Sequence, residues 1–177
     1  RLIRFQFNNE NPDEKISGAL TLKGADGEGL AIITPYAEKD FFFYEYKMPA
    51  MTVEGTVNYA GKDYSFLPQS SYAVLDWGRG AWPQQNRWLW GAGSGFVDGE
   101  LLSFNLGYGF GEARGTTENG VVYRGKVHKL DRVRWIYDIN DYMKPWKFTS
   151  NDGRFEMDFQ PVYLLHSDLK LKEMLGF

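Results

Sequence analysis

Hydrophobic and polar residues alternate along most of the chain, and turn-forming residues interrupt the alternation at short intervals. No window of about 15 residues places apolar positions at a helical spacing. Glycine-containing turns flanked by β-branched or aromatic residues are typical of hairpins, and they occur at 24–29, 59–62, 97–100, 123–126 and 151–154. The pattern predicts one all-β domain over residues 1–177, an antiparallel meander that forms a barrel or a β-sandwich.

The predicted strands are 16–23, 29–35, 40–47, 52–59, 62–67, 72–76, 86–97, 100–111, 119–124, 126–136, 145–151 and 153–160. Two segments are ambiguous. KLDRVRWIYDIN at 129–140 also fits a helical turn, and SDLKLKEMLGF at 167–177 fits either a short helix or a strand.

The hairpin around Asp98-Gly99 is the best determined, because a two-residue turn fixes the pairing of both strands. It sets Trp90 opposite Gly107 and Trp88 opposite Gly109. One face is then apolar and is expected to be core: Leu89, Leu102, Phe104, Leu106, Tyr108 and Phe110. The other face is aromatic, small and polar, and we expect it to be a concave ligand-binding surface: Trp88, Trp90, Ala92, Ser94, Ser103, Asn105, Gly107 and Gly109.

Composition excludes several classes of function. The net charge is −3 and the basic residues are scattered, so nucleic acid is not an expected partner. The chain has no cysteine, which excludes disulfides, thiolate nucleophiles and cysteine-based zinc sites and favours a cytoplasmic location. No apolar run approaches the roughly 20 residues of a transmembrane helix. We expect no cofactor and no metal.

Asp76 and Arg79 share the glycine-flanked segment LDWGRG, and two interpretations are open. Asp76 fits a general acid whose pKa is raised by burial beside Trp77 and Trp82, with Arg79 as a clamp for a carboxylate or oxyanion. Alternatively, Asp76 and Arg79 neutralise each other in a structural ion pair.

The segment GEARGTTENG at 111–120 follows the glycine-rich face. Glu118 and Asn119 fit a second carboxylate and an amide donor above the same cavity, and a pair formed by Asp76 and Glu118 would suit hydrolysis of a glycosidic bond. Alternatively, Thr117 and Asn119 cap a loop.

Histidine offers little metal-binding potential, since His128 and His166 are the only two in the chain. His128 is expected opposite Val121 across the Arg124-Gly125 turn. The ligand-binding residues predicted from the sequence are Trp77, Trp82, Trp88, Trp90, Asn105, Tyr108, Asn119 and His128.

Six segments together resemble the family called domain of unknown function 2804: YAVLDWGRGAWP, NRWLWGAGSG, FNLGYGFG, TTENGVVYRGKVHKL, MKPW and SNDGRFEMDFQP. Members of that family are about twice this length. The resemblance implies that the chain is the C-terminal part of a two-half protein, with the N-terminal half as a partner. A truncated barrel would also expose strand edges, through which a second copy can pair.

More distantly, VEGTVNYAGKDYSF followed by Tyr72, Asp76 and Trp77 is similar to a lipocalin-like group that includes hydroxyneurosporene synthase and tocopherol cyclase. That likeness implies a calycin-like barrel and a hydrophobic ligand, with Asp76 as a proton donor. The group has a histidine where this chain has Trp77, which weighs against hydratase or cyclase chemistry.

The leading hypothesis is therefore a lipocalin-like module that binds a lipid or an isoprenoid. The alternatives are an enzyme that uses Asp76, either a lipid hydratase-isomerase or, with Glu118, a glycan hydrolase, and a structural half-domain without a site of its own.

Overall fold

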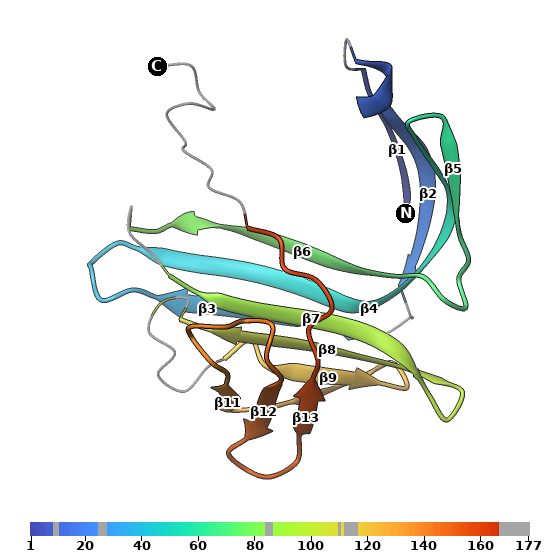
Figure 1. The fold of residues 1–177 in the computed structure, drawn as a ribbon. Coiled ribbons are helices and arrows are strands. Elements are labelled where there is room, and N and C mark those ends of the chain that lie inside the picture. Colours follow the sequence, from blue (N-terminus) through green and yellow to red (C-terminus); the bar gives the residue numbers. More distant parts are fainter. Residues whose placement is uncertain (9–10, 25–27, 84–86, 110, 112–116, 167–177) are drawn as a thin grey trace. The chain divides into compact units, whose positions relative to one another are not determined.

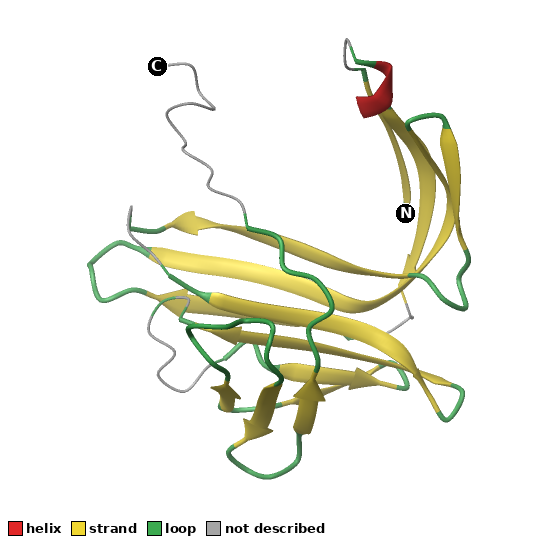
Figure 2. Ribbon diagram, viewed as in Figure 1, coloured by secondary structure: helices red, strands yellow, loops and turns green. Residues whose placement is uncertain are grey.

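A computed structural model describes residues 1–8, 11–24, 28–83, 87–109, 111 and 117–166. The regular structure of the described residues is strand apart from one short 3-10 helix, η1 (Pro12–Glu14), which confirms the all-β prediction (Figure 2). The ambiguous tail at 167–177 lies outside the described residues. The chain contains two compact units, Arg1–Asp131 and Arg132–Phe177.

The first unit contains a six-stranded antiparallel sheet built around one long central strand, β4. On one side β4 pairs with β2 and β3, and on the other with β5 and β6, while β1 adds to β2. The bounds are β1 (Leu2–Phe7), β2 (Ile16–Gly24), β3 (Leu30–Pro35), β4 (Phe42–Tyr59), β5 (Lys62–Phe66) and β6 (Tyr72–Ala81).

A bulge divides β4 into two parts. The pairing with β6 shifts between Met48 and Met51, where β4 holds one residue more than its partner, and Pro49 at this point has no N–H to offer a ladder. β3 and β6 flank β4 before the bulge, and β2 and β5 flank it after the bulge. Figure 1 shows the consequence: β1, β2 and β5 form an arm that bends away from β3 and β6.

The bend gives the six-stranded sheet a concave face, on the side to which the arm turns. Outside the bulge, every residue of β1–β6 on this face is apolar, aromatic or glycine, except Lys62 and Arg79. Its large members include Ile33, Tyr44, Tyr46, Val53, Phe66 and Trp77. The opposite, convex face carries most of the polar side chains, such as the ion pair between Lys23 and Glu54 on the arm.

A four-stranded antiparallel sheet packs against the convex face, in the order β10, β9, β8, β7 (Figure 1). Its strands are β7 (Leu89–Val97), β8 (Glu100–Tyr108), β9 (Gly120–Tyr123) and β10 (Lys126–Lys129). The packing is direct. Ser94 donates a 3.0 Å hydrogen bond to the carbonyl of Pro49, the rings of Phe96 and Tyr72 are 6.0 Å apart, and Gly120 lies against Leu30.

The β7–β8 register agrees with the prediction from Leu89 with Tyr108 to Val97 with Glu100, and the predicted pair of Trp88 with Gly109 lies beyond the ends of the two strands. Asp98 and Gly99 both have positive φ, 51° and 77°, as a two-residue type I′ turn requires. The predicted pairing of His128 with Val121 is also confirmed.

The second unit is a three-stranded sheet of β11 (Val133–Ile136), β12 (Trp146–Ser150) and β13 (Glu156–Phe159). Trp146 stacks on Tyr137 at 4.5 Å, and Trp135 meets Phe148 edge to face at 4.9 Å. Aromatic packing of this kind gives a small sheet its own core.

Several predicted boundaries differ from the structure. The predicted strands 40–47 and 52–59 form one strand, β4, because the bulge bends the strand without ending it. The predicted strand 126–136 is two strands, β10 and β11, which belong to different units, and β11 excludes the helical turn considered there. β1 was missed, and β6 continues five residues beyond the predicted end at 76, through the glycine-rich segment.

The glycines of β7 allow a test of the packing on the outer side of the four-stranded sheet. A Cβ added at Gly93 would lie 2.6 Å from the ring of Phe104, whereas one at Gly95 would meet nothing within 4 Å. We expect Gly93→Ala to lower the free energy of unfolding by about 1–3 kcal/mol because the ring must move. Gly95→Ala is the matched control and should be close to neutral in urea denaturation. Equal effects of the two substitutions would contradict this packing.

Candidate functional site

The segment LDWGRG distributes its candidate residues over both faces of β6. Asp76 pairs with Lys47 and points to the convex face, towards the four-stranded sheet. Trp77 and Arg79 are one and three residues further on, so they project from the concave face. Asp76 and Arg79 therefore do not form the ion pair that was considered, and the acid belongs to a different group of charges from the arginine.

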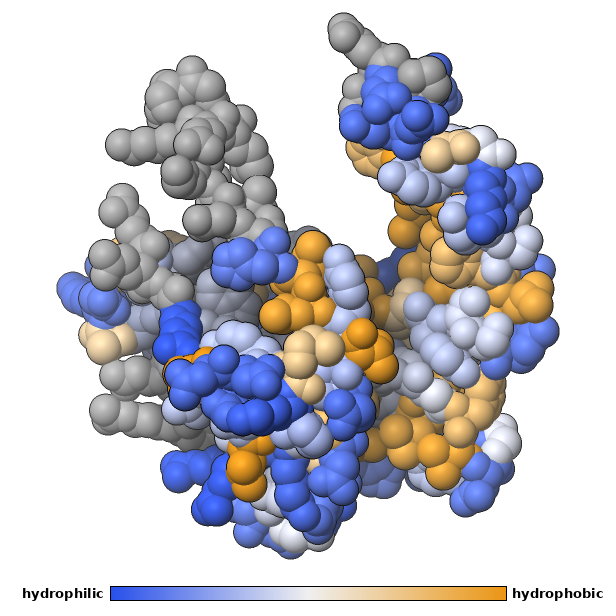
Figure 3. All heavy atoms as spheres, in the orientation of Figure 1, coloured by the Kyte–Doolittle hydropathy of each residue, from blue (hydrophilic) through white to orange (hydrophobic). Residues whose placement is uncertain are grey.

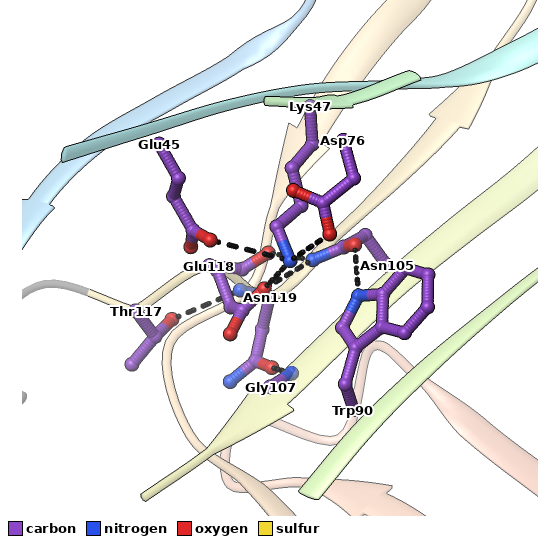
Figure 4. A network of polar contacts seen from close by, with 9 residues as sticks. All are labelled: Glu45, Lys47, Asp76, Trp90, Asn105, Gly107, Thr117, Glu118 and Asn119. Atoms are coloured by element: carbon purple, nitrogen blue, oxygen red, sulfur yellow. Dashed lines mark hydrogen bonds and ion pairs between the residues drawn. The ribbon is translucent and has the colours of Figure 1, made fainter. Parts of the chain in front are cut away.

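Asp76 belongs to a cluster of four charged side chains between the two sheets, which we call the Lys47 cluster: Glu45, Lys47, Asp76 and Glu118 (Figure 4). Lys47 Nζ lies 2.6 Å from Glu118 Oε2 and 3.3 Å from both Glu45 Oε2 and Asp76 Oδ2. The side chains of Glu45, Lys47 and Glu118 are 4–7% exposed, and that of Asp76 is 40% exposed. Only Asp76 connects the cluster to solvent.

The four-stranded sheet supplies the hydrogen bonds that surround the cluster. Trp90 Nε1 donates to Asn105 Oδ1 at 2.9 Å, and Asn105 Nδ2 donates to Glu118 Oε2 at 3.0 Å. The ammonium of Lys47 also lies 4.9 Å from the centre of the Trp90 ring, a cation–π contact. Every charged member thus has a partner, as burial of ions demands.

The electrostatics of the Lys47 cluster follow from its excess of carboxyl groups. Burial raises the pKa of Glu45 to about 7, and the neighbouring Glu118 adds to the rise while Lys47 opposes it. Burial by itself would lower the pKa of Lys47, but its contacts with Glu118, Glu45 and Asp76 outweigh this and raise it. Near neutral pH the cluster therefore holds a protonated lysine beside a glutamate that is close to its titration point.

The geometry limits what the cluster can do chemically. A glycan hydrolase needs an open space between its two carboxyl groups for the scissile bond. Here the Lys47 ammonium touches both Asp76 and Glu118 and occupies that position. In the described part of the chain, no group of three or more His, Cys, Asp or Glu side chains is placed to hold a metal ion.

The polar face of β7 and β8, predicted to be an open ligand surface, is instead the interface between the two sheets. Asn105 and Ser103 are fully buried, and Gly107 lies so close to Glu118 that no side chain fits there. The register was predicted correctly, but the face it defines is covered by β4.

Glu118 and Asn119 lie in the segment that leads into β9. Asn119 accepts a 2.8 Å hydrogen bond from Gly107 N and donates one of 2.8 Å to the carbonyl of Asp131. Thr117 Oγ1 donates to the carbonyls of Leu130 and Asp131. These bonds agree with the interpretation that Thr117 and Asn119 shape a loop, and the loop presents Glu118 to Lys47.

Four other candidates do not join the cluster. Tyr108 and His128 are exposed and lie on the far face of the four-stranded sheet, away from Trp90. Trp82 meets the ring of Phe43 edge to face at 5.6 Å and is 49% exposed. Trp88 lies just before β7 and is 51% exposed.

Glu45 and Lys47 were not predicted as site residues from the sequence. In the run FFFYEYKMP they alternate with Tyr44 and Tyr46. Alternation of charged and aromatic residues predicts a half-buried strand but does not indicate which face is covered. The usual assumption places the aromatic rings inside, whereas the structure places the charges there.

The concave face therefore holds the candidates Trp77 and Arg79 with an apolar surround. Trp77 meets Tyr44 edge to face at 5.8 Å, and its side chain is 50% exposed. Ile33 and Phe42 on the same face are 63% and 41% exposed. Figure 3 shows hydrophobic residues at the surface of the arm and of the bend, interspersed with hydrophilic ones. Large apolar groups exposed together on one sheet face indicate an interaction surface.

Comparison with known proteins identifies a family. The model of the family described as "Domain of unknown function (DUF2804)" matches residues 1–172. No curated protein and no solved structure matches the chain. Within the described residues, no helix is long and apolar enough to span a membrane.

The Lys47 cluster predicts a dependence of stability on pH. The pKa of Glu45 is raised from 4.5 to about 7 by folding, so between these values the folded protein keeps a proton that the unfolded chain has lost. The stabilisation from this bound proton is therefore complete below the pKa that Glu45 has in the unfolded chain. It is lost as the pH rises through the pKa of about 7 that Glu45 has in the folded protein. Relative to the wild type, Glu45→Gln should gain about 1–3 kcal/mol in free energy of unfolding between acidic and mildly alkaline pH.

Denaturation across this pH range measures the difference between the two proteins, so the titration of groups outside the Lys47 cluster cancels. Glu54→Gln is the matched control because Glu54 is an exposed glutamate of the same strand. Its stability difference from the wild type should not vary with pH. A Glu45→Gln difference that is equally flat would contradict the buried, protonated state of Glu45.

Proposed function

The chain belongs to the DUF2804 family, and we propose that it binds a hydrophobic small molecule on the concave face of its six-stranded sheet. The main observation in support is that β4 buries charged side chains and exposes aromatic ones. Glu45 and Lys47 face the second sheet, while Tyr44, Tyr46 and their apolar neighbours face outward into the bend. Covering such a surface stabilises a complex by roughly 25 cal/mol for each Å² of apolar area removed from water.

Glycines shape the surface in a way that suits a ligand. At three glycines an added Cβ would clash with a neighbouring side chain. They are Gly18 beneath Phe5, Gly24 beside Met48 and Gly29 beneath Tyr46. Because these side chains lie over bare backbone, they line the sheet and do not fill the space in front of it. An apolar molecule can then lie along the sheet.

A second candidate is acid–base chemistry at the Lys47 cluster. The observation in its favour is that Asp76 is the one solvent-connected member, next to a buried glutamate whose pKa is about 7. This function requires a substrate to reach the convex side of β6, opposite the face that binds the ligand in the first proposal. The two candidates can therefore be separated by substitutions on the two faces of one strand.

The test uses adjacent residues of β6. We expect Trp77→Ala to weaken binding of a neutral apolar probe, such as retinol or Nile red, about tenfold or more, because the indole contributes the largest apolar contact of this segment. Asp76→Asn, one residue earlier but on the other face, should leave the affinity unchanged. Ile33→Gln is a second concave-face variant for the case in which Trp77→Ala unfolds.

Fluorescence titration measures all four proteins, with circular dichroism to confirm that each is folded. Loss of binding in Asp76→Asn together with retention in Trp77→Ala would place the ligand at the Lys47 cluster. No binding of either probe to the wild type would contradict the proposal.

A further inference from the structure

The charged residues of the six-stranded sheet are divided unequally between its two faces. No residue of β1–β6 on the concave face is acidic, and the two charged residues there are both cations, Lys62 and Arg79. The acidic residues of these strands, Glu45, Glu54, Asp63 and Asp76, all lie on the convex face. The concave face thus combines an apolar surface with positive charge.

Arg79 lies at one end of this face, in a row formed by Ile33, Tyr44 and Arg79 on three paired strands. Its neighbour along β6 on the same face is Trp77. Among the described residues, the Arg79 guanidinium has neither an ion-pair nor a hydrogen-bond partner, in contrast to Lys47 on the other face. All N–H donors of this exposed guanidinium, which is bordered by an indole and a phenol ring, are therefore available to a ligand.

We propose that the ligand of the concave face is an anionic amphiphile, whose carboxylate head pairs with Arg79 while its apolar tail lies over Tyr44 and Trp77 towards the bend. This inference rests on the proposed function, to which it adds the chemical class of the ligand. A guanidinium and a carboxylate form two parallel charge-assisted hydrogen bonds, and the apolar surround strengthens them by excluding water.

Lys62 does not offer an equivalent position. It is at the far end of the arm, beside the turn that joins β4 to β5, and its ammonium lies 5.0 Å from the centre of the Tyr64 ring. Arg79, by contrast, is next to the exposed indole of Trp77. We therefore assign the head-group contact to Arg79 and use Lys62 as the control.

The test compares palmitate with methyl palmitate, which share a tail and differ in the charge of the head. At about pH 8 the fatty acid carboxyl is ionised. We expect the wild type to bind palmitate about 10- to 100-fold more tightly than the ester, the ratio typical of a hydrogen bond to a charged group. Arg79→Met should reduce palmitate affinity to that of the ester and leave ester affinity unchanged.

Two further variants sharpen the result. Arg79→Lys keeps the charge without the planar fork and should retain part of the preference for palmitate. Lys62→Met should retain all of it. A preference that persists in Arg79→Met, or a wild type that binds both lipids equally, overturns the inference while the proposed function stands. A wild type that binds neither lipid also overturns the inference, and the retinol and Nile red titrations then decide separately whether the proposed function stands.

Discussion

The ammonium of Lys47, held between carboxyl groups of two sheets, is the contact on which the arrangement of the first unit depends. Glu45 and Asp76 approach it from the six-stranded sheet, and Glu118 approaches from the segment that enters β9. Removing one partner of a buried ion pair typically costs about 3–5 kcal/mol, because the other charge is left without compensation. The cluster therefore fixes which face of β4 meets the second sheet.

This choice determines the character of the other face. Since β4 alternates charged and aromatic residues before its bulge, turning Glu45 and Lys47 inward turns Tyr44 and Tyr46 outward. The bulge at Met48–Met51 then bends the sheet towards the aromatic side, and the arm of β1, β2 and β5 adds further apolar residues to the same concave surface (Figure 1). A buried ionic interface on one side and an exposed apolar surface on the other are thus two results of one strand pattern.

The sequence was informative where local chemistry fixes geometry. Asp98-Gly99 determined the register of β7 and β8 through its positive φ angles, and with it the side on which Trp90 and Asn105 lie. It could not show that this side would be covered, because Glu118, Lys47 and Asn105 meet only in the folded chain, from segments far apart in sequence. Trp77 and Arg79 were recognised as candidates, but their separation from Asp76 depended on β6 continuing as a strand through WGRGA, where the glycines suggested a turn.

Binding of a ligand on the concave face is tested most directly by methyl NMR spectra of the chain recorded with and without palmitate. Met48 and Ile33 lie on the concave face, whereas Leu30 and Val122 lie between the two sheets. We predict that the Met48 and Ile33 methyl resonances shift on addition of palmitate while those of Leu30 and Val122 stay in place. Shifts confined to Leu30 and Val122 would contradict it, because the ligand would then lie on the side of the Lys47 cluster.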